Sequence, residues 1–222
     1  GLPVGITQAL FAIAAIFVQN LTNTFGTVFI AASTVVMRVD GFAMLPNFTF
    51  GTAMTTFVGQ NVGAMKIDRV RKGTRDGLKI GVTTSVVLVG LILIFGKFLM
   101  GLFTNTEEVI EVSYEMMCIL GIGYIGVAIN QILSGTIRGA GDTMTPMWVA
   151  LATTTVIRLP IAYGMAYLTR SEALPTGEPR SIYYSLVISW VMGAIITAVI
   201  YKIGRWAKRA RIGGKIVDIS NM

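Results

Sequence analysis

The sequence predicts an all-α membrane protein built as a bundle of six transmembrane helices. Only 13% of its 222 residues are charged, whereas soluble domains carry about 25%, and the mean hydropathy is +0.71. The apolar residues also gather in long segments, each of ~20 residues or more, which is enough to cross ~30 Å of hydrocarbon as a helix. The positive residues cluster beside these segments, as charge next to a membrane does.

Each of the six apolar segments is predicted to be one membrane-spanning helix. The predicted spans cover residues 4–25, 28–63, 78–99, 109–137, 147–168 and 182–203. The second and fourth spans are longer than a bilayer requires, so we expect them to tilt, bend or project into water. We expect residues 1–222 to form a single lobe, whose last part, residues 204–222, is a basic tail.

The distribution of lysine and arginine predicts the orientation. Thirteen of them follow the second, fourth and sixth spans: Lys66, Arg69, Arg71, Lys72, Arg75, Lys79, Arg138, Lys202, Arg205, Lys208, Arg209, Arg211 and Lys215. Only Lys97, Arg170 and Arg180 lie on the other side. Since positive residues favour the cytoplasmic side, we expect a multi-pass protein of the inner (plasma) membrane with both termini in the cytoplasm.

Several functions are disfavoured by composition. The chain has no histidine and one cysteine, Cys118, so histidine catalysis, an internal disulfide and a cysteine metal cluster are excluded. The net charge of +7 does not form a patch interleaved with aromatic residues, so we expect no nucleic-acid partner. We find no nucleophile with a base and no phosphate loop, and therefore expect no enzyme, no cofactor and no metal site. The chain starts at Gly1 without a methionine, and we expect it to be a piece of a longer protein.

The second predicted span carries the most unusual residues, since Arg38, Asp40 and Pro46 lie deep within it. A charge at the bilayer centre costs at least ~2.5–3.5 kcal/mol, so each charge needs a partner or water. Residues two positions apart do not face each other on a helix, and each of the two is therefore expected to find a partner elsewhere. Pro46 removes one helical hydrogen bond and is the predicted bend.

Arg158, just before Pro160 in the fifth span, completes a predicted intramembrane charge network with Arg38 and Asp40. Its role is either structural or part of a transport pathway, and the same two readings hold for the uncharged polar residues of the first and fourth spans. These residues either bond a neighbouring helix or line a substrate cavity; they are Gln8, Gln19, Asn23, Asn130, Gln131 and Ser134.

Two glycine-rich corners resemble a known family. Gly59-Gln60-Asn61-Val62-Gly63-Ala64, followed by the basic segment, resembles one corner of multidrug and toxic compound extrusion (MATE) transporters, and Ile137-Arg138-Gly139-Ala140-Gly141-Asp142-Thr143 resembles the matching later corner. The opening Gly1-Leu2-Pro3 resembles the start of the seventh helix of that family, and Arg158-Leu159-Pro160 a pair in its eleventh. Both corners carry Gly-x-x-x-Gly, a spacing that lets two helices approach closely.

The resemblance implies that the chain is the C-terminal six-helix lobe of a twelve-helix antiporter. Its partner would be a homologous N-terminal lobe, in the same full-length chain or in a second copy. Such proteins expel drugs, organic cations and other amphipathic substrates by alternating access, with H+ or Na+ as the coupling ion. Some members bind that ion with carboxylates in the first and fourth helices of this lobe, where this sequence has no mid-span acid. The departure favours coupling through the other lobe, and slightly favours the proton.

Two alternatives remain open at the level of sequence. One is a lipid-linked oligosaccharide flippase of related fold, for which Arg38 and Arg158 would be candidates to bind pyrophosphate. The other is a membrane scaffold subunit with no transport of its own.

Overall fold

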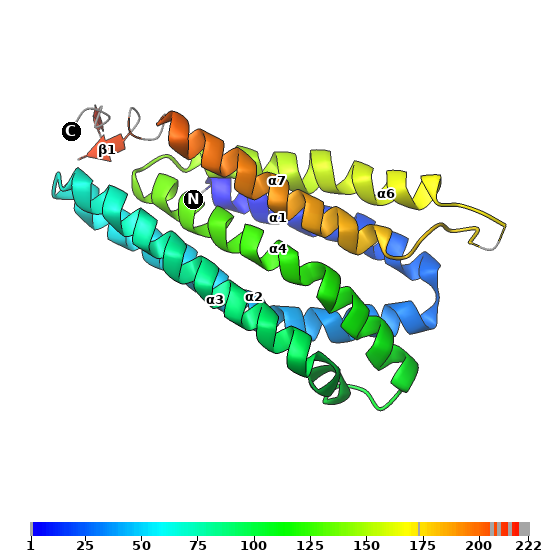
Figure 1. Cartoon of the computed structure of the whole chain (residues 1–222). Coiled ribbons are helices and arrows are strands. Elements are labelled where there is room, and N and C mark those ends of the chain that lie inside the picture. The colour runs from blue at the N-terminus through cyan, green and yellow to red at the C-terminus, as the bar shows by residue number, and fades with distance from the viewer. Residues whose placement is uncertain (1, 173, 205–206, 208–209, 213–214, 218–222) are drawn as a thin grey trace.

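The structure is a computed structural model that describes residues 2–172, 174–204, 207, 210–212 and 215–217. It is a bundle of long helices that run alternately up and down (Figure 1). Its longer helices are α1 (Leu2–Thr22), α2 (Thr27–Gly63), α3 (Ile67–Gly101), α4 (Glu107–Gly139) and α7 (Ser181–Ile203). A composite helix lies before α7 and joins α5 (Met144–Leu151), the π-helix η2 (Ala152–Arg158) and α6 (Leu159–Leu168).

A short turn and a small ribbon complete the bundle. The 3₁₀ turn η1 (Asn23–Phe25) connects α1 to α2. Beyond α7, β1 (Ala210–Ile212) and β2 (Lys215–Val217) form a small antiparallel ribbon in the predicted tail. In Figure 1, α1 begins and α7 ends at the same end of the bundle, where this ribbon also lies. We call this end of the bundle the ribbon end.

The helices have the length and composition of membrane spans, which confirms the predicted all-α membrane fold. Within the described ranges, the helices that are long and apolar enough to cross a membrane are α2, α3, α4, the composite helix Met144–Leu168 and α7. The remaining helix, α1, has 21 residues without a charged side chain. At 1.5 Å per residue it is ~30 Å long, so it can still form the first predicted span, residues 4–25.

The third helix starts earlier than the apolar pattern predicts. The segment that we expected to be a basic loop, residues 66–79, is helical, because α3 already begins at Ile67. The chain reverses at Met65, whose φ of 59° is in the left-handed region. Lysine and arginine are good helix formers, so α3 extends beyond the apolar segment into water, whereas hydropathy detects only the apolar part that begins near residue 78.

The fifth helix contains the π-helical turn, which sequence periodicity does not predict. Pro160 follows this turn and has no N–H to donate to the helical ladder. The wider i→i+5 pattern is the local rearrangement by which helices absorb such a missing bond, and π turns often occur at functional sites. Here the last residue of the turn is Arg158.

Helix α4 is the centre of the bundle and packs against α2, α3 and α7 (Figure 1). It approaches α2 closely at glycines: a Cβ added to Gly139 would lie 2.6 Å from the carbonyl oxygen of Thr55, and one added to Gly51 would lie 3.1 Å from that of Gln131. Gly63 has nothing within 4 Å. The close approach therefore uses the Gly-x-x-x-Gly of the later corner, whereas Gly63 of the earlier corner takes no part.

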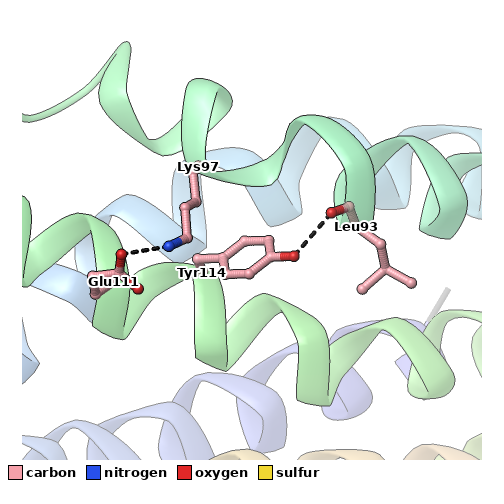
Figure 2. Close-up of polar contacts among 4 residues, drawn as sticks. All are labelled: Leu93, Lys97, Glu111 and Tyr114. Carbon is pink, nitrogen blue, oxygen red and sulfur yellow. Dashed lines mark hydrogen bonds and ion pairs between the residues drawn. The ribbon is translucent and has the colours of Figure 1, made fainter.

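Ion pairs fasten α4 at the end opposite the ribbon. Figure 2 shows Lys97 of α3 paired with Glu111, while the hydroxyl of Tyr114 donates a hydrogen bond of 2.9 Å to the carbonyl oxygen of Leu93. On its other side, Glu115 pairs with Arg180 at 2.6 Å, just before α7. Both pairs are about half exposed, so each contributes no more than ~1 kcal/mol.

Candidate functional site

The partly buried carboxylate of Asp40 is bonded to a tyrosine of the central helix. The Tyr124 hydroxyl donates a hydrogen bond of 2.7 Å to Oδ1 of Asp40, which joins α4 to α2. Tyr124 is only 1% exposed, and its ring stacks on Trp190 of α7 with centroids 6.0 Å apart. The tyrosine is thus fixed by packing on one side and by the carboxylate on the other.

Arg158 is the positive charge nearest to this pair. It attracts Asp40 electrostatically, although no ion pair joins the two within the described part of the chain. Its Nε is buried and has no hydrogen-bond partner. An unpaired buried N–H is costly, so a guest molecule, water or a second conformation is required to satisfy it.

A second tyrosine adds to this polar interior. The Tyr183 hydroxyl of α7 donates a hydrogen bond of 2.8 Å to Oγ of Ser33 on α2, and Tyr183 also interacts electrostatically with Asp40. We refer to Ser33, Asp40, Tyr124, Arg158 and Tyr183 as the Asp40 cluster. It draws on α2, α4, η2 and α7, so any relative movement of these helices changes its geometry.

Arg38 lies apart from the Asp40 cluster. Its side chain is exposed, and its guanidinium lies over the ring of Phe103, 5.8 Å from the centroid, in the turn after α3. Arg38 and Asp40 thus have different partners, as we expected. Of the three residues in the predicted charge network, only Asp40 and Arg158 interact with each other.

The predicted cavity residues divide into an exposed and an internal group. Gln19 donates a hydrogen bond of 2.9 Å to Asn23, and both are exposed at the end of α1 and in η1. The side chain of Gln8 lies outside the described residues, although its backbone belongs to α1. Gln19 and Asn23 therefore lie on the surface of the bundle.

The internal group lies between α4 and α7. Oδ1 of Asn130 accepts hydrogen bonds from Thr197 at 2.7 Å and from Ser134 at 3.3 Å, and Ser134 is buried. Gln131 is half-buried, with its backbone against Gly51. Asn130 thus bonds α7, Ser134 bonds Asn130 within α4, and Gln131 packs against α2.

Sequence reasoning missed several members of this polar interior. Tyr124 and Tyr183 were not singled out, although a buried tyrosine hydroxyl usually needs a partner and so points to one. Asn47 was also missed; it is 1% exposed, accepts a hydrogen bond of 3.0 Å from Ser85 and leaves its Nδ2 unbonded. Pro46 lies next to it inside α2, which continues through the proline. The described residues contain no group of acids or cysteines that could hold a metal ion.

A helical bundle that is long and apolar enough to cross the membrane several times, and whose interior contains an acid, a buried tyrosine and an arginine, has the architecture of a polytopic transport protein. The chain belongs to the MatE family, whose model matches residues 3–164.

Curated relatives agree with this assignment. The chain is 26% identical over 190 residues to the probable multidrug resistance protein YoeA of Bacillus subtilis, covering 85% of the chain and 41% of YoeA. It is 24% identical over 210 residues to the probable multidrug resistance protein NorM of Thermotoga maritima, covering 95% of the chain and 44% of NorM. These relatives are transporters and not enzymes. The chain spans less than half the length of each.

Solved structures show the same fold. One described as the outward-facing conformation of a multidrug resistance MATE family transporter superposes with a TM-score of 0.81 at 19% identity, over 93% of this chain and 46% of that one. A MATE structure in a bent conformation gives a TM-score of 0.82 at 20% identity, over 93% and 45%. The MATE transporter ClbM in complex with Rb+ gives 0.80 at 19% identity, over 93% and 47%.

Proposed function

We propose that this chain is the C-terminal six-helix lobe of an antiporter that expels drugs or organic cations across the plasma membrane. The observation that carries the proposal is the match of nearly the whole chain to about half of proteins named for multidrug resistance. A lobe of this size needs a second one to enclose a cavity, and the solved relatives are about twice as long. The partner is then a homologous N-terminal lobe.

The mechanism would be alternating access, in which the two lobes rock against each other around a central cavity. Gln19 and Asn23 are exposed and supply the polar wall of this lobe, together with Gln8. Asn130, Gln131 and Ser134 lie deeper on α4, where Asn130 bonds Thr197 of α7 and Gln131 packs against α2, so we assign them a role in transmitting movement behind that wall.

The coupling ion would be H+ or Na+. One solved relative is a complex with Rb+, which supports a monovalent cation. In this lobe Asp40 is an acid deep within a span, and it already interacts with Tyr124 and Arg158. We assign it to the internal charge network that changes between conformations, with the primary ion site in the other lobe. Both termini would lie in the cytoplasm, so the ribbon end is the cytoplasmic end.

The test is efflux of ethidium or norfloxacin from cells that express the full-length gene. The proton gradient and the sodium gradient are dissipated in separate experiments. Loss of the gradient that drives transport should abolish efflux and so identifies the coupling ion. Asp40→Asn should reduce efflux by about ten-fold or more at normal expression, because it removes the charge that attracts Arg158. Asp76→Asn on α3 serves as the control and should leave efflux unchanged. Efflux that survives the loss of both gradients would refute coupling, and unchanged efflux in Asp40→Asn would leave Asp40 a packing role.

A further inference from the structure

An apolar groove runs along the seam between α2 and α3, in the half of the bundle that contains Arg38. Its volume is about 360 Å³, and every lining residue is apolar; among them are Val39, Phe42, Leu91, Phe95, Phe98 and Leu99. Phe42 and Phe98 are 70% and 68% exposed. The groove therefore lies open on the surface of the lobe and presents aromatic rings to whatever fills it.

Arg38 lies at one end of this groove. On α2 it precedes Phe42 by one helical turn, which places the two side chains next to each other. Its guanidinium lies over Phe103, four residues beyond Leu99 and so just past the α3 side of the groove. The side chain is exposed, and no carboxylate pairs with it in the described part of the chain. The groove thus has an apolar body and a single unpaired cation at its end.

We propose that this groove is a phospholipid-binding site, with one acyl chain along the α2–α3 seam and the phosphate on Arg38. The guanidinium presents a planar fork of donors that matches a phosphate and binds it with two parallel hydrogen bonds. The acyl chain gains van der Waals contacts along the groove, but only the phosphate fixes the position of the lipid.

Charge complementarity favours a phospholipid over an expelled cation. An organic cation would be repelled by Arg38, and the groove offers no carboxylate to attract it. The volume is at the low end of the range for small-molecule pockets, so it suits a single chain rather than a whole multi-ring drug. A bilayer also supplies phosphate at the depth to which a long arginine side chain extends. The site explains why a charge persists in a span without an acidic partner.

Native mass spectrometry of the purified full-length protein tests this site. The probe is phosphatidylglycerol with one palmitoyl and one oleoyl chain, added after the protein has been stripped of lipid in detergent. Diacylglycerol with the same chains and glycerol 3-phosphate separate the contribution of the chains from that of the phosphate. The wild-type protein should bind the phospholipid at least about ten-fold more tightly than either fragment, since each fragment lacks one half of the contacts.

Two variants and two matched controls assign the binding to this groove. Arg38→Gln removes the phosphate ligand, and Leu91→Trp fills the groove; each should lose one tightly bound lipid. Arg170→Gln is the charge control, because Arg170 also lies over an aromatic ring, that of Tyr167 at 5.3 Å. Leu93→Trp is the size control, because Leu93 is 45% exposed on the same helix but does not line the groove.

Arg38→Lys keeps the positive charge and should retain more lipid than Arg38→Gln. If Arg38→Gln does not fold, the comparison of Leu91→Trp with Leu93→Trp decides the question. Equal lipid retention in Leu91→Trp and Leu93→Trp would overturn the proposal. So would equal binding of phospholipid and diacylglycerol, or displacement of the lipid by ethidium at stoichiometric concentration.

Discussion

The hydroxyl of Tyr124 donates a hydrogen bond of 2.7 Å to Oδ1 of Asp40, and this bond joins the central helix α4 to α2. The tyrosine is buried, and its ring stacks on Trp190 of α7. The bond therefore links three helices at a point where a carboxylate would otherwise lack a donor. Its strength bears both on the stability of the lobe and on the movement that we propose for it.

Tyr124→Phe should lower the free energy of unfolding by about 1.5–3 kcal/mol, because it removes a hydrogen bond to a charged group and leaves the carboxylate under-bonded. Thermal unfolding in detergent measures the loss. The control is Tyr184→Phe, since Tyr184 is 41% exposed and its hydroxyl bonds no residue in the described chain. Equal melting temperatures for the two variants would show that the bond does not contribute.

Gly139→Ala should destabilise the lobe by about 1–3 kcal/mol through overpacking. The new Cβ would lie 2.6 Å from the carbonyl oxygen of Thr55 and 2.7 Å from Cβ of Val58, so α2 and α4 would have to separate. Gly63→Ala is the matched control, because nothing lies within 4 Å of the added atom. Thermal unfolding should separate the two variants clearly; similar melting curves would argue against close packing of these helices.

Pro160→Ala should convert the π-helical turn into regular α-helix, since the new N–H can complete the helical ladder. Hydrogen exchange followed by mass spectrometry should then show slower exchange across residues 152–158. Pro146→Ala is the control, because Pro146 lies in the first turn of α5, where N–H groups lack helical partners in any case. If exchange is unchanged in Pro160→Ala, the proline is not the cause of the π turn.

The two ion pairs at the end opposite the ribbon should contribute little and should depend on salt. Glu111→Gln and Glu115→Gln should each cost about 0.2–1 kcal/mol at low ionic strength, and less at 1 M salt, because both pairs are half exposed. Thermal unfolding at both salt concentrations measures this difference. Glu172→Gln, which removes an acid without an ion pair in the described chain, should be neutral at both. A loss larger than ~2 kcal/mol would indicate that these pairs are less hydrated than their exposure implies.

Much of the membrane architecture could be predicted, because crossing a bilayer imposes a length and an apolar composition that can be counted along the chain. The predicted second span, residues 28–63, differs from α2 by one residue at its start. The helix that contains the third predicted span, residues 78–99, begins before that span, since residues 67–77 are helical but polar, and hydropathy registers depth in the membrane rather than helix. The π turn was missed because it changes hydrogen bonding without changing the apolar pattern.

The candidate site was predictable only in part. A lone acid and arginines within apolar spans marked Arg38, Asp40 and Arg158, since the cost of a buried charge applies wherever the chain folds. Which of them meet was not predictable. Arg38 lies over Phe103, and Asp40 bonds a tyrosine 84 positions further along the chain.

The sequence by itself determined that the chain is helical, lies in a membrane and resembles MATE transporters, because composition, span length and the corner motifs are local properties. The tertiary structure decided that Asp40 pairs with Tyr124, that Arg158 lacks a partner for its Nε, and that Asn130 joins α4 to α7. These contacts depend on how far each helix is rotated and how closely it approaches its neighbour. Close approach at Gly51 and Gly139 fixes both quantities for α2 and α4, and neither can be read from one helix alone.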